Sequence, residues 1–230
     1  MPTIEKTAIE FAKRVEAIKL ATVDYIYDLG ANLSRQELAI LISEIDFTAV
    51  VNELGYVSNL DKLTARYIDV LRGLDPIAPL SDDILQALVN TDRAFYLAKG
   101  GDLANVMKVE LTRGALLGES RQGMKAAISE LGGYRPDQIQ TLVDTSMRTF
   151  GREVNLAMMA EMPDETKYTY VGPIDDKTRD ICLQMAGAGE LTQSEIVSSF
   201  GSSVLTDGGG FNCRHEWRIT TTARRKALEN

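Results

Sequence analysis

Apolar residues recur at helical spacing through residues 1–162, and this pattern constrains the fold more than any other feature of the sequence. Near the start of the chain the steps between apolar residues are mostly three, four or seven, along Ile4, Ala8, Phe11, Val15, Ile18, Tyr25 and Leu29. Such a stripe predicts a helix of about 25 residues that buries one face, with Gly30 as its C-terminal cap. Similar stripes predict seven helices, over about 4–29, 34–55, 59–74, 81–100, 103–117, 120–131 and 136–161.

Local signals set the ends of these helices. In the segment SRQE, Ser34 and Glu37 match a capping box, in which each side chain bonds the other residue's backbone N–H. Gly100 and Gly101 are typical of a helix end, and Pro136 suits the first turn of a helix. We therefore predict one helix that starts at Ser34, another that stops at the glycine pair, and a long helix from Pro136.

The character of the sequence changes at Pro163. The segment KYTYVGP predicts a strand, and TQSE at 192–195 is a second capping box, opening a helix that Gly201 ends. Between them, DDKTRDIC reads as a helix start with Asp175 or Asp176 as N-cap, which places Cys182 about two turns in. We predict an α+β fold: a mostly helical domain over 1–162, then a small α+β domain over 163–230 with a short antiparallel sheet.

The segment GGGFNCRHEW at 208–217 contains the chain's single histidine, its single tryptophan and one of its two cysteines. Residues alternate from 211 to 220, because polar side chains separate Phe211, Cys213, His215, Trp217 and Ile219. Successive side chains of a strand point to opposite faces. The pattern therefore predicts a half-buried strand, entered through a turn at Gly208–Gly210.

Cys182, Cys213 and His215 are the residues of this region that could bind a metal or take part in catalysis. We interpret them, with Trp217, as core packing, because free cysteine is among the most buried residue types. Two alternatives stay open. A zinc-stapled domain would use the three as ligands, with Asp175, Asp176, Asp180 or water as the fourth, and an enzyme would pair a cysteine nucleophile with His215 as base.

Charged residues of the small domain have two readings as well. Arg214 and Arg218 face away from the predicted core, and with Asp176, Arg179 and Asp180 they either clamp two segments together or form a solvated face. The sequence contains no phosphate-binding loop, no dinucleotide fingerprint and no serine-hydrolase or zinc-protease motif. We therefore predict no catalytic residue, no cofactor and no metal.

The net charge of the chain limits the kinds of partner that it can bind. The net charge is −8, which disfavours nucleic-acid binding over the whole surface. Residues 211–226 nevertheless carry five basic residues against one acidic, so weak DNA contact through Arg224, Arg225 and Lys226 stays an alternative. No apolar run reaches the 18–20 or so residues that cross a membrane, so we expect no membrane partner. Two cysteines 31 positions apart are typical of a reducing compartment such as the cytoplasm.

The order of elements from about 137 onward resembles a known family. The long helix containing LVDTSMRTFGREVNLAMMAEM leads into YTYVGP, then DDKTRDIC, and a glycine-rich turn leads into NCRHEW. This order is similar to the C-terminal domain of phage Mu F-type head-morphogenesis proteins, also called minor capsid proteins. The matching positions are Asp176, Thr178, Arg179, Cys182, Asn212, Cys213 and Arg214, with His215 and Trp217 completing the segment.

Two positions depart from the pattern of that family. Where the family often has a second cysteine after the first, this chain has Met185, and where it often has a histidine before Asn-Cys-Arg, this chain has Phe211. Both departures remove would-be metal ligands. The histidine of this chain, His215, follows the motif instead.

The resemblance implies a structural protein of the virion. We expect a non-enzymatic minor head protein that contacts the portal or other head-shell proteins, located in the capsid and in the host cytoplasm during assembly. Some relatives carry a toxin enzyme after this domain, and we expect none here because few residues follow the strand. An oligomer stays open as an alternative, since a second chain could cover the apolar stripe along Ile4, Phe11, Ile18 and Tyr25.

Overall fold

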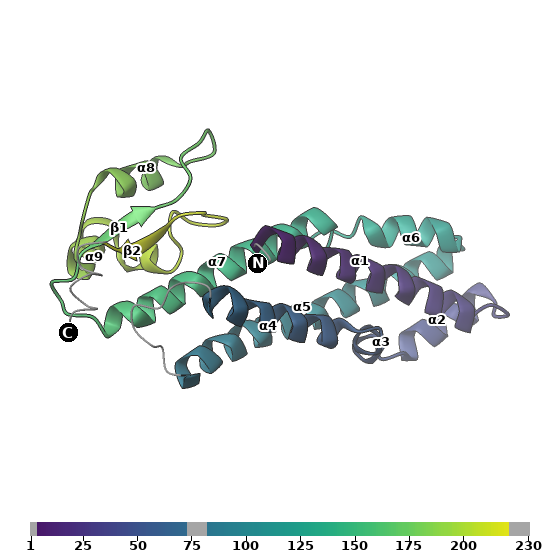
Figure 1. The fold of residues 1–230 in the computed structure, drawn as a ribbon. Coiled ribbons are helices and arrows are strands. Elements are labelled where there is room, and N and C mark those ends of the chain that lie inside the picture. Colours follow the sequence, from purple (N-terminus) through teal and green to yellow (C-terminus); the bar gives the residue numbers. More distant parts are fainter. Residues whose placement is uncertain (1–3, 73–81, 221–230) are drawn as a thin grey trace. The chain divides into compact units, whose positions relative to one another are not determined.

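The computed structural model of the chain describes residues 4–72 and 82–220, and Figure 1 shows its fold. In the described residues, helices fill most of the chain before residue 161, and a small two-stranded sheet follows. The predicted α+β class is therefore confirmed. The elements before the sheet are α1 (Ile4–Leu29), α2 (Arg35–Glu44), α3 (Phe47–Glu53), α4 (Tyr56–Arg72), α5 (Asp82–Leu117), α6 (Arg121–Ser129) and α7 (Pro136–Ala160). Those of the C-terminal part are β1 (Tyr168–Val171), α8 (Asp180–Gly187), α9 (Gln193–Phe200), the 3-10 turn Ser202–Leu205 and β2 (Glu216–Ile219).

The chain folds into two compact units. The first contains the described residues up to Ile68 together with Thr91–Val143, and the second contains the described parts of Asp69–Asn90 and of the chain from Asp144 onward. The predicted boundary at 162/163 lies two residues after the end of α7, whereas the division between the units falls inside that helix. None of the helices described is long and apolar enough to cross a membrane.

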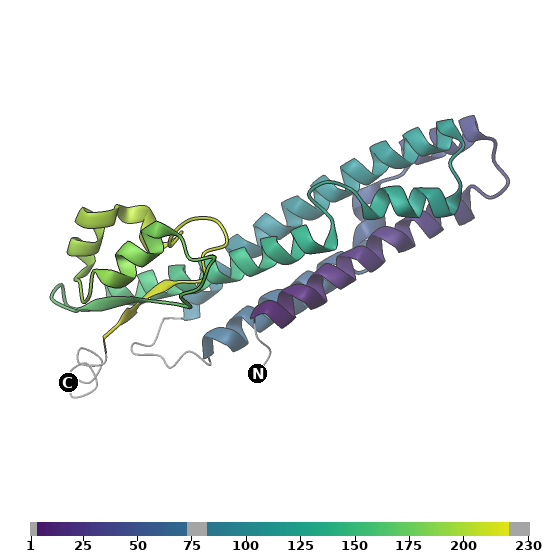
Figure 2. The same ribbon diagram turned by 90° about the horizontal axis from the view of Figure 1, so that it is seen from above.

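The first unit is a helical bundle in which α1 lies beside α6 (Figures 1 and 2). Ala8, Phe11, Val15 and Ile18 are buried as predicted, but Tyr25 and Leu29 are 44% and 49% exposed. A step of seven residues falls about 20° short of two full helical turns, so a long stripe drifts off the buried face. In the last turns of α1 the buried positions are instead Val23 and Ile26.

A buried lysine joins α1 to the end of α6. Lys19 is fully buried, and its Nζ donates to the Glu16 carboxylate at 2.8 Å and to the backbone oxygens of Ser129 and Tyr134 at 3.2 and 2.9 Å. The sequence pattern did not single out this residue. All three donors of the ammonium group are satisfied, which makes its burial tolerable.

Two predicted helix boundaries in the first unit are wrong. The helix expected over 34–55 starts at its capping box as predicted, but it ends at Glu44, because Ile45 is extended and Asp46 caps a new helix. Asp46 accepts the backbone N–H groups of Thr48 and Ala49. Aspartate is among the preferred N-cap residues, so the chain contains a second start signal inside the apolar stripe.

The second wrong boundary is the helix end predicted at Gly100 and Gly101. Helix α5 is 36 residues long and runs through both glycines without a break. A Cβ at position 100 would lie 2.5 Å from the Tyr56 ring, so the glycine admits an aromatic side chain instead of ending the helix. The helix expected from Asn59 starts slightly earlier, at Tyr56. The expected start at Ser81 lies outside the described residues.

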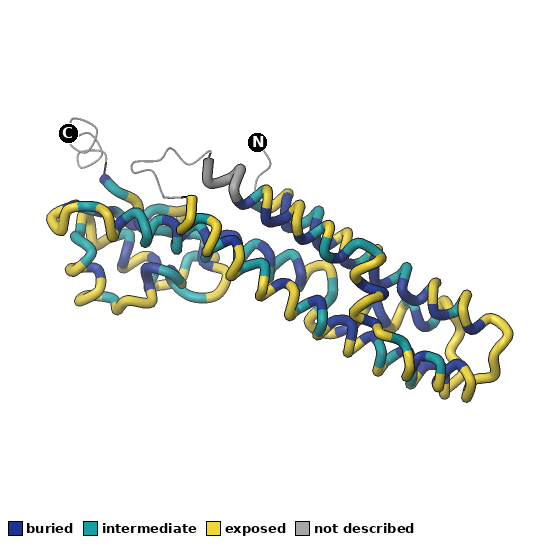
Figure 3. Tube along the Cα trace, turned by 90° about the horizontal axis from the view of Figure 1, so that it is seen from below, coloured by how far each residue is buried: buried dark blue, intermediate teal, exposed yellow. Residues whose placement is uncertain are grey.

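The second unit has β1 and β2 paired antiparallel, with Tyr170 opposite Trp217. Tyr168 and Tyr170 are both buried and share one face of β1, which is the strand predicted at KYTYVGP. Between its exposed ends, α7 alternates between buried and intermediate positions (Figure 3), and its Met159 belongs to this core. The core consists of Met159, Tyr168, Tyr170, Cys182, Met185, Ile196, Val204, Leu205, Cys213 and Trp217. The capping box at Thr192 and Glu195 and the end at Gly201 are confirmed.

The second strand is shorter than predicted. Cys213, His215 and Trp217 are buried in alternation with less buried neighbours, but only Glu216–Ile219 pair as a strand. Phe211 is 65% exposed, so its assignment to the buried face is wrong. The chain turns through residues 208–212, where Gly208 and Gly210 have positive φ and Cys213 donates to the Gly210 carbonyl. That turn takes position 211 out of the alternation.

Candidate functional site

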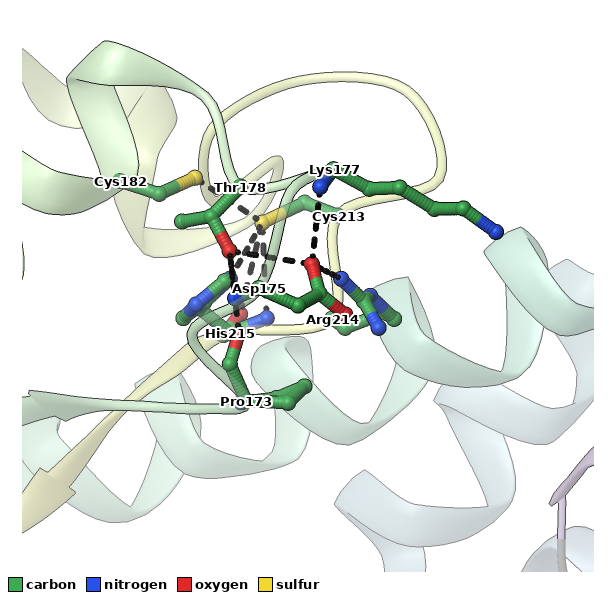
Figure 4. A network of polar contacts seen from close by, with 8 residues as sticks. All are labelled: Pro173, Asp175, Lys177, Thr178, Cys182, Cys213, Arg214 and His215. Atoms are coloured by element: carbon green, nitrogen blue, oxygen red, sulfur yellow. Dashed lines mark hydrogen bonds and ion pairs between the residues drawn. The ribbon is translucent and has the colours of Figure 1, made fainter.

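Cys182, Cys213 and His215 meet in the core of the second unit. Cys182 is the third residue of α8, and the other two residues lie just before β2 (Figure 4). The two sulfur atoms are 3.7 Å apart, and Cys213 Sγ lies 3.8 Å from His215 Nδ1. One ligand atom from each of the three residues lies within 4.8 Å of the others. All three side chains are buried, with 2%, 3% and 2% of their surface exposed.

Glycines allow the chain to approach this cluster closely. A Cβ on Gly209 would lie 2.2 Å from Cys182 Sγ, and a Cβ on Gly208 would lie 3.1 Å from Cys213 Sγ. Directly after β1, a Cβ on Gly172 would lie 2.4 Å from the His215 ring. The predicted glycine turn therefore does more than reverse the chain, because it brings backbone against two sulfur atoms.

A buried arginine from α7 fixes the segment that carries Cys213 and His215. Arg152 is 3% exposed, and its guanidinium donates to the backbone oxygens of His215 at 3.0 Å, Thr206 at 3.2 Å and Cys213. The sequence analysis missed this residue. A signal existed, because Arg152, Leu156 and Met159 are spaced i, i+4, i+7 and therefore share one face of α7.

Tyr170 connects the cluster to the aromatic core. Its ring stacks on His215 with centroids 5.5 Å apart and an angle of 9°, and it packs against Trp217 at 4.9 Å. Its hydroxyl lies 3.4 Å from Cys213 Sγ and 4.0 Å from Cys182 Sγ. The predicted packing role of Trp217 agrees with its 4% exposure.

The two thiols are electrostatically different. Burial raises the pKa of Cys213, but hydrogen bonds from the Tyr170 hydroxyl and from backbone N–H groups of His215 and Gly209 favour the thiolate more strongly, so the pKa falls to about 6. Burial raises the pKa of Cys182, and the nearby Cys213 sulfur raises it further. Burial and the same sulfur raise the pKa of Tyr170.

An ion pair closes the rim of the site (Figure 4). Arg214 donates to Asp175 Oδ1 at 2.6 Å, and this contact, despite some desolvation, lowers the pKa of Asp175 to about 2. Asp175 also accepts from the Lys177 backbone N–H at 3.0 Å. The clamp proposed from the sequence therefore exists for Arg214, but its partner is Asp175, while Asp176 is exposed.

The start of α8 differs from the prediction. Arg179 occupies the N-cap and makes no side-chain capping bond, so neither Asp175 nor Asp176 caps the helix. Cys182 consequently lies in the first turn of α8, not two turns in. The Arg179 guanidinium donates instead to the backbone oxygens of Gly209 and Phe211 at 3.2 and 2.6 Å, which ties α8 to the glycine turn.

The remaining predicted positions take separate places. Asn212 has a φ of 56°, and among the described residues no other non-glycine residue has a positive φ. Asparagine tolerates this conformation better than most residues. Arg218 pairs with Glu216 on its own strand, so it does not join the clamp. Arg224, Arg225 and Lys226 lie outside the described residues.

The arrangement suits metal ligation or packing better than nucleophilic catalysis. A thiol and an imidazole lie close together, as a nucleophile and its base would, but a nucleophilic cysteine needs an accessible position. Both sulfur atoms are covered by the core, the glycine turn and Tyr170. A buried set of two sulfurs and one nitrogen is instead the donor set of a soft divalent ion.

Comparisons with family models, with curated proteins and with solved structures find no match for this chain. The resemblance to phage head-morphogenesis proteins therefore depends on the motif residues alone, and it stays a prediction.

Proposed function

We propose that the chain is a non-enzymatic structural protein of a phage particle, a minor head protein that acts through contacts with the portal or other head-shell proteins. The observation that carries the proposal is the way in which the motif residues meet. The motif consists of two segments about thirty residues apart, and most of its members build one closure between α8 and the turn before β2.

Each contact in that closure joins one segment to the other. Arg179 bonds the backbone of the glycine turn, Cys182 contacts Cys213, and Arg214 pairs with Asp175. Asn212 supplies the positive φ that the turn requires. A motif whose residues serve the fold is typical of a structural module, whereas a catalytic motif places side chains around a space for substrate.

Exposed apolar residues of the first unit support a role in protein contact. Four of them lie close in the sequence to Tyr27 or Glu119, whose hydrogen bond joins the last turn of α1 to the residues between α5 and α6. These four are Leu29, Leu33, Leu116 and Leu117, with 49%, 41%, 56% and 63% of their surface accessible. Apolar side chains that cluster at the surface mark interaction sites more often than isolated ones do.

The test is whether the chain enters assembled heads. The head genes of the parent genome would be expressed together, particles separated on a density gradient, and the chain quantified by mass spectrometry. We expect a few copies per particle, retained after washing in high salt. A chain that stays in the soluble fraction while heads assemble would refute the proposal.

A matched pair of variants tests the apolar surface. Leu117→Gln changes a residue that is 63% exposed at the α5 end, and Val109→Gln changes one that is 64% exposed on the same helix. Both positions are outside the core, so neither change is expected to unfold the protein. We expect fewer incorporated copies for Leu117→Gln and wild-type incorporation for Val109→Gln. Equal incorporation would remove this surface from the proposal.

A further inference from the structure

Among the donor atoms of Cys182, Cys213 and His215, two separations match those of a tetrahedral metal site, and the third is within 4.8 Å. A zinc–sulfur bond is about 2.3 Å and a zinc–nitrogen bond about 2.0–2.1 Å, so two sulfurs on one ion lie roughly 3.8 Å apart and a sulfur and a nitrogen roughly 3.6 Å. The observed separations are 3.7 Å between Cys182 and Cys213 and 3.8 Å between Cys213 and His215. The sulfur separation is far beyond the 2.05 Å or so of a disulfide.

The imidazole of His215 is buried beside the two sulfur atoms. His215 is 2% exposed, and its Nε2 has no hydrogen-bond partner among the described residues. A metal bond at Nδ1, which lies 3.8 Å from Cys213 Sγ, gives that buried nitrogen a strong partner and leaves the ring proton on Nε2. The stacked Tyr170 ring and the glycine at position 172 hold the imidazole in the orientation that faces Cys213.

The surroundings of the cluster favour a divalent ion. Two thiolates neutralise the two charges of the ion, so the complex is electrically neutral in a buried place. The Tyr170 hydroxyl lies 3.4 and 4.0 Å from the two sulfurs and occupies a further side of the cluster. Arg152 holds the backbone of two of the three ligand residues, Cys213 and His215, by hydrogen bonds to their carbonyl oxygens.

We propose that Cys182, Cys213 and His215 bind one zinc ion or a similar soft divalent cation, which staples α8 to the segment before β2. Binding replaces two S–H protons by two sulfur–metal bonds and one nitrogen–metal bond, releases both protons to solvent and changes no oxidation state. The inference is independent of the virion proposal, because it depends only on the geometry of the second unit.

The first test is native mass spectrometry of the full chain, purified with a phosphine reductant and micromolar zinc. We expect a mass increased by one zinc ion less two protons. A chelator should remove the ion and lower the melting temperature reported by Trp217 fluorescence, and added zinc should restore both. A metal-free mass with unchanged melting in chelator would overturn the proposal.

The second test replaces zinc by Co²⁺ and uses variants. The chain has two cysteines and one histidine in all, so a spectrum with two thiolate-to-cobalt charge-transfer contributions identifies the site without ambiguity. Cys182→Ser and His215→Ala should each weaken Co²⁺ binding at least 100-fold. Met185→Leu is the matched control, since it removes a buried sulfur from the same helix at nearly constant volume and should bind Co²⁺ like wild type.

The cobalt spectrum of the wild-type protein decides the matter if the ligand variants fail to fold. Intense tetrahedral bands that disappear on titration with zinc, at one equivalent per chain, support the site. Weak octahedral bands, or cobalt binding that survives in a folded Cys182→Ser variant, overturn it.

Discussion

Replacing Arg152 by methionine is the change that most directly tests how the second unit is held together. The guanidinium is 3% exposed and donates to three backbone oxygens, those of Thr206, Cys213 and His215. Methionine keeps the length of the side chain and most of its apolar contact but removes every donor. The three oxygens then lose their common partner in a place with little access to water.

The expected loss follows from these contacts. A hydrogen bond to a charged donor contributes about 1.5–3 kcal/mol, so three independent bonds set an upper limit of roughly 5–9 kcal/mol. Two effects reduce it, because the buried charge no longer needs to be desolvated and the turn can relax toward water. We expect Arg152→Met to lower the free energy of unfolding of this unit by about 3–5 kcal/mol, because each buried acceptor left without a partner costs about 1–3 kcal/mol.

The chain supplies its own probe and its own control. Trp217 is the single tryptophan and is buried in this unit, so its fluorescence during urea unfolding reports this unit and not the helical bundle. Arg148→Met is the matched control, one turn earlier on α7, where the arginine is 25% exposed and pairs with Asp144 four residues away. That variant should lose about 1 kcal/mol or less. If both variants unfolded at the same urea concentration, Arg152 would not be the anchor described here.

Three further changes probe the same unit. Trp217→Ala should cost about 3–5 kcal/mol in thermal or urea unfolding followed by circular dichroism, because a buried tryptophan leaves a large cavity. Asp175→Asn should destabilise at neutral pH. Since the Arg214 contact lowers the folded pKa of Asp175 to about 2 from an ordinary 3.8, the difference from wild type should hold above pH 4 or so and fade as pH drops toward 2. Gly209→Ala should lower the melting temperature and reduce the free energy of unfolding by about 1–3 kcal/mol, because its Cβ would lie 2.2 Å from Cys182 Sγ.

Each of these changes has a control in the chain. Phe211→Ala removes an aromatic residue that is 65% exposed, so unchanged melting is expected, and a loss equal to that of Trp217→Ala would contradict the burial argument. Asp176→Asn alters the adjacent exposed carboxylate and should not reproduce the pH dependence of Asp175→Asn. Gly187→Ala adds a Cβ that meets nothing within 4 Å, so a loss as large as that of Gly209→Ala would show that contact with sulfur is not the cause.

Features that depend on a few neighbouring residues were predictable from the sequence. The capping boxes at Ser34 and Thr192 are closed by residues three positions later, and both form as expected. The long helix from Pro136 also follows from spacing within one segment. Gly100 shows the limit of such reasoning. Its backbone is helical, and the Tyr56 ring occupies the place where a side chain would lie, a neighbour that nothing near position 100 in the sequence indicates.

The candidate site was predictable only in part, for the same reason. Alternation from 213 to 217 placed Cys213, His215 and Trp217 on one face, and the structure buries all three. The meeting of Cys213 with Cys182 depends on how two segments 31 residues apart pack, and so does the choice of Asp175 over its neighbour as the partner of Arg214. Arg152 and Cys213 are 61 residues apart in the sequence, so no local pattern connects them.

The size of the sheet explains why polar groups matter so much in the second unit. Two strands of four residues form a hairpin-sized sheet that is marginal by itself, and it needs packing against other elements to persist. The connections that supply this packing converge on residues 208–215: Arg152 from α7, Arg179 and Cys182 from α8, and Tyr170 from β1. A turn held from three sides by charged, sulfur and aromatic groups is a place where one bound ion joins elements that apolar burial alone holds weakly. Metal binding and structural function are therefore compatible in this unit, because an ion at Cys182, Cys213 and His215 strengthens the closure that the motif residues build.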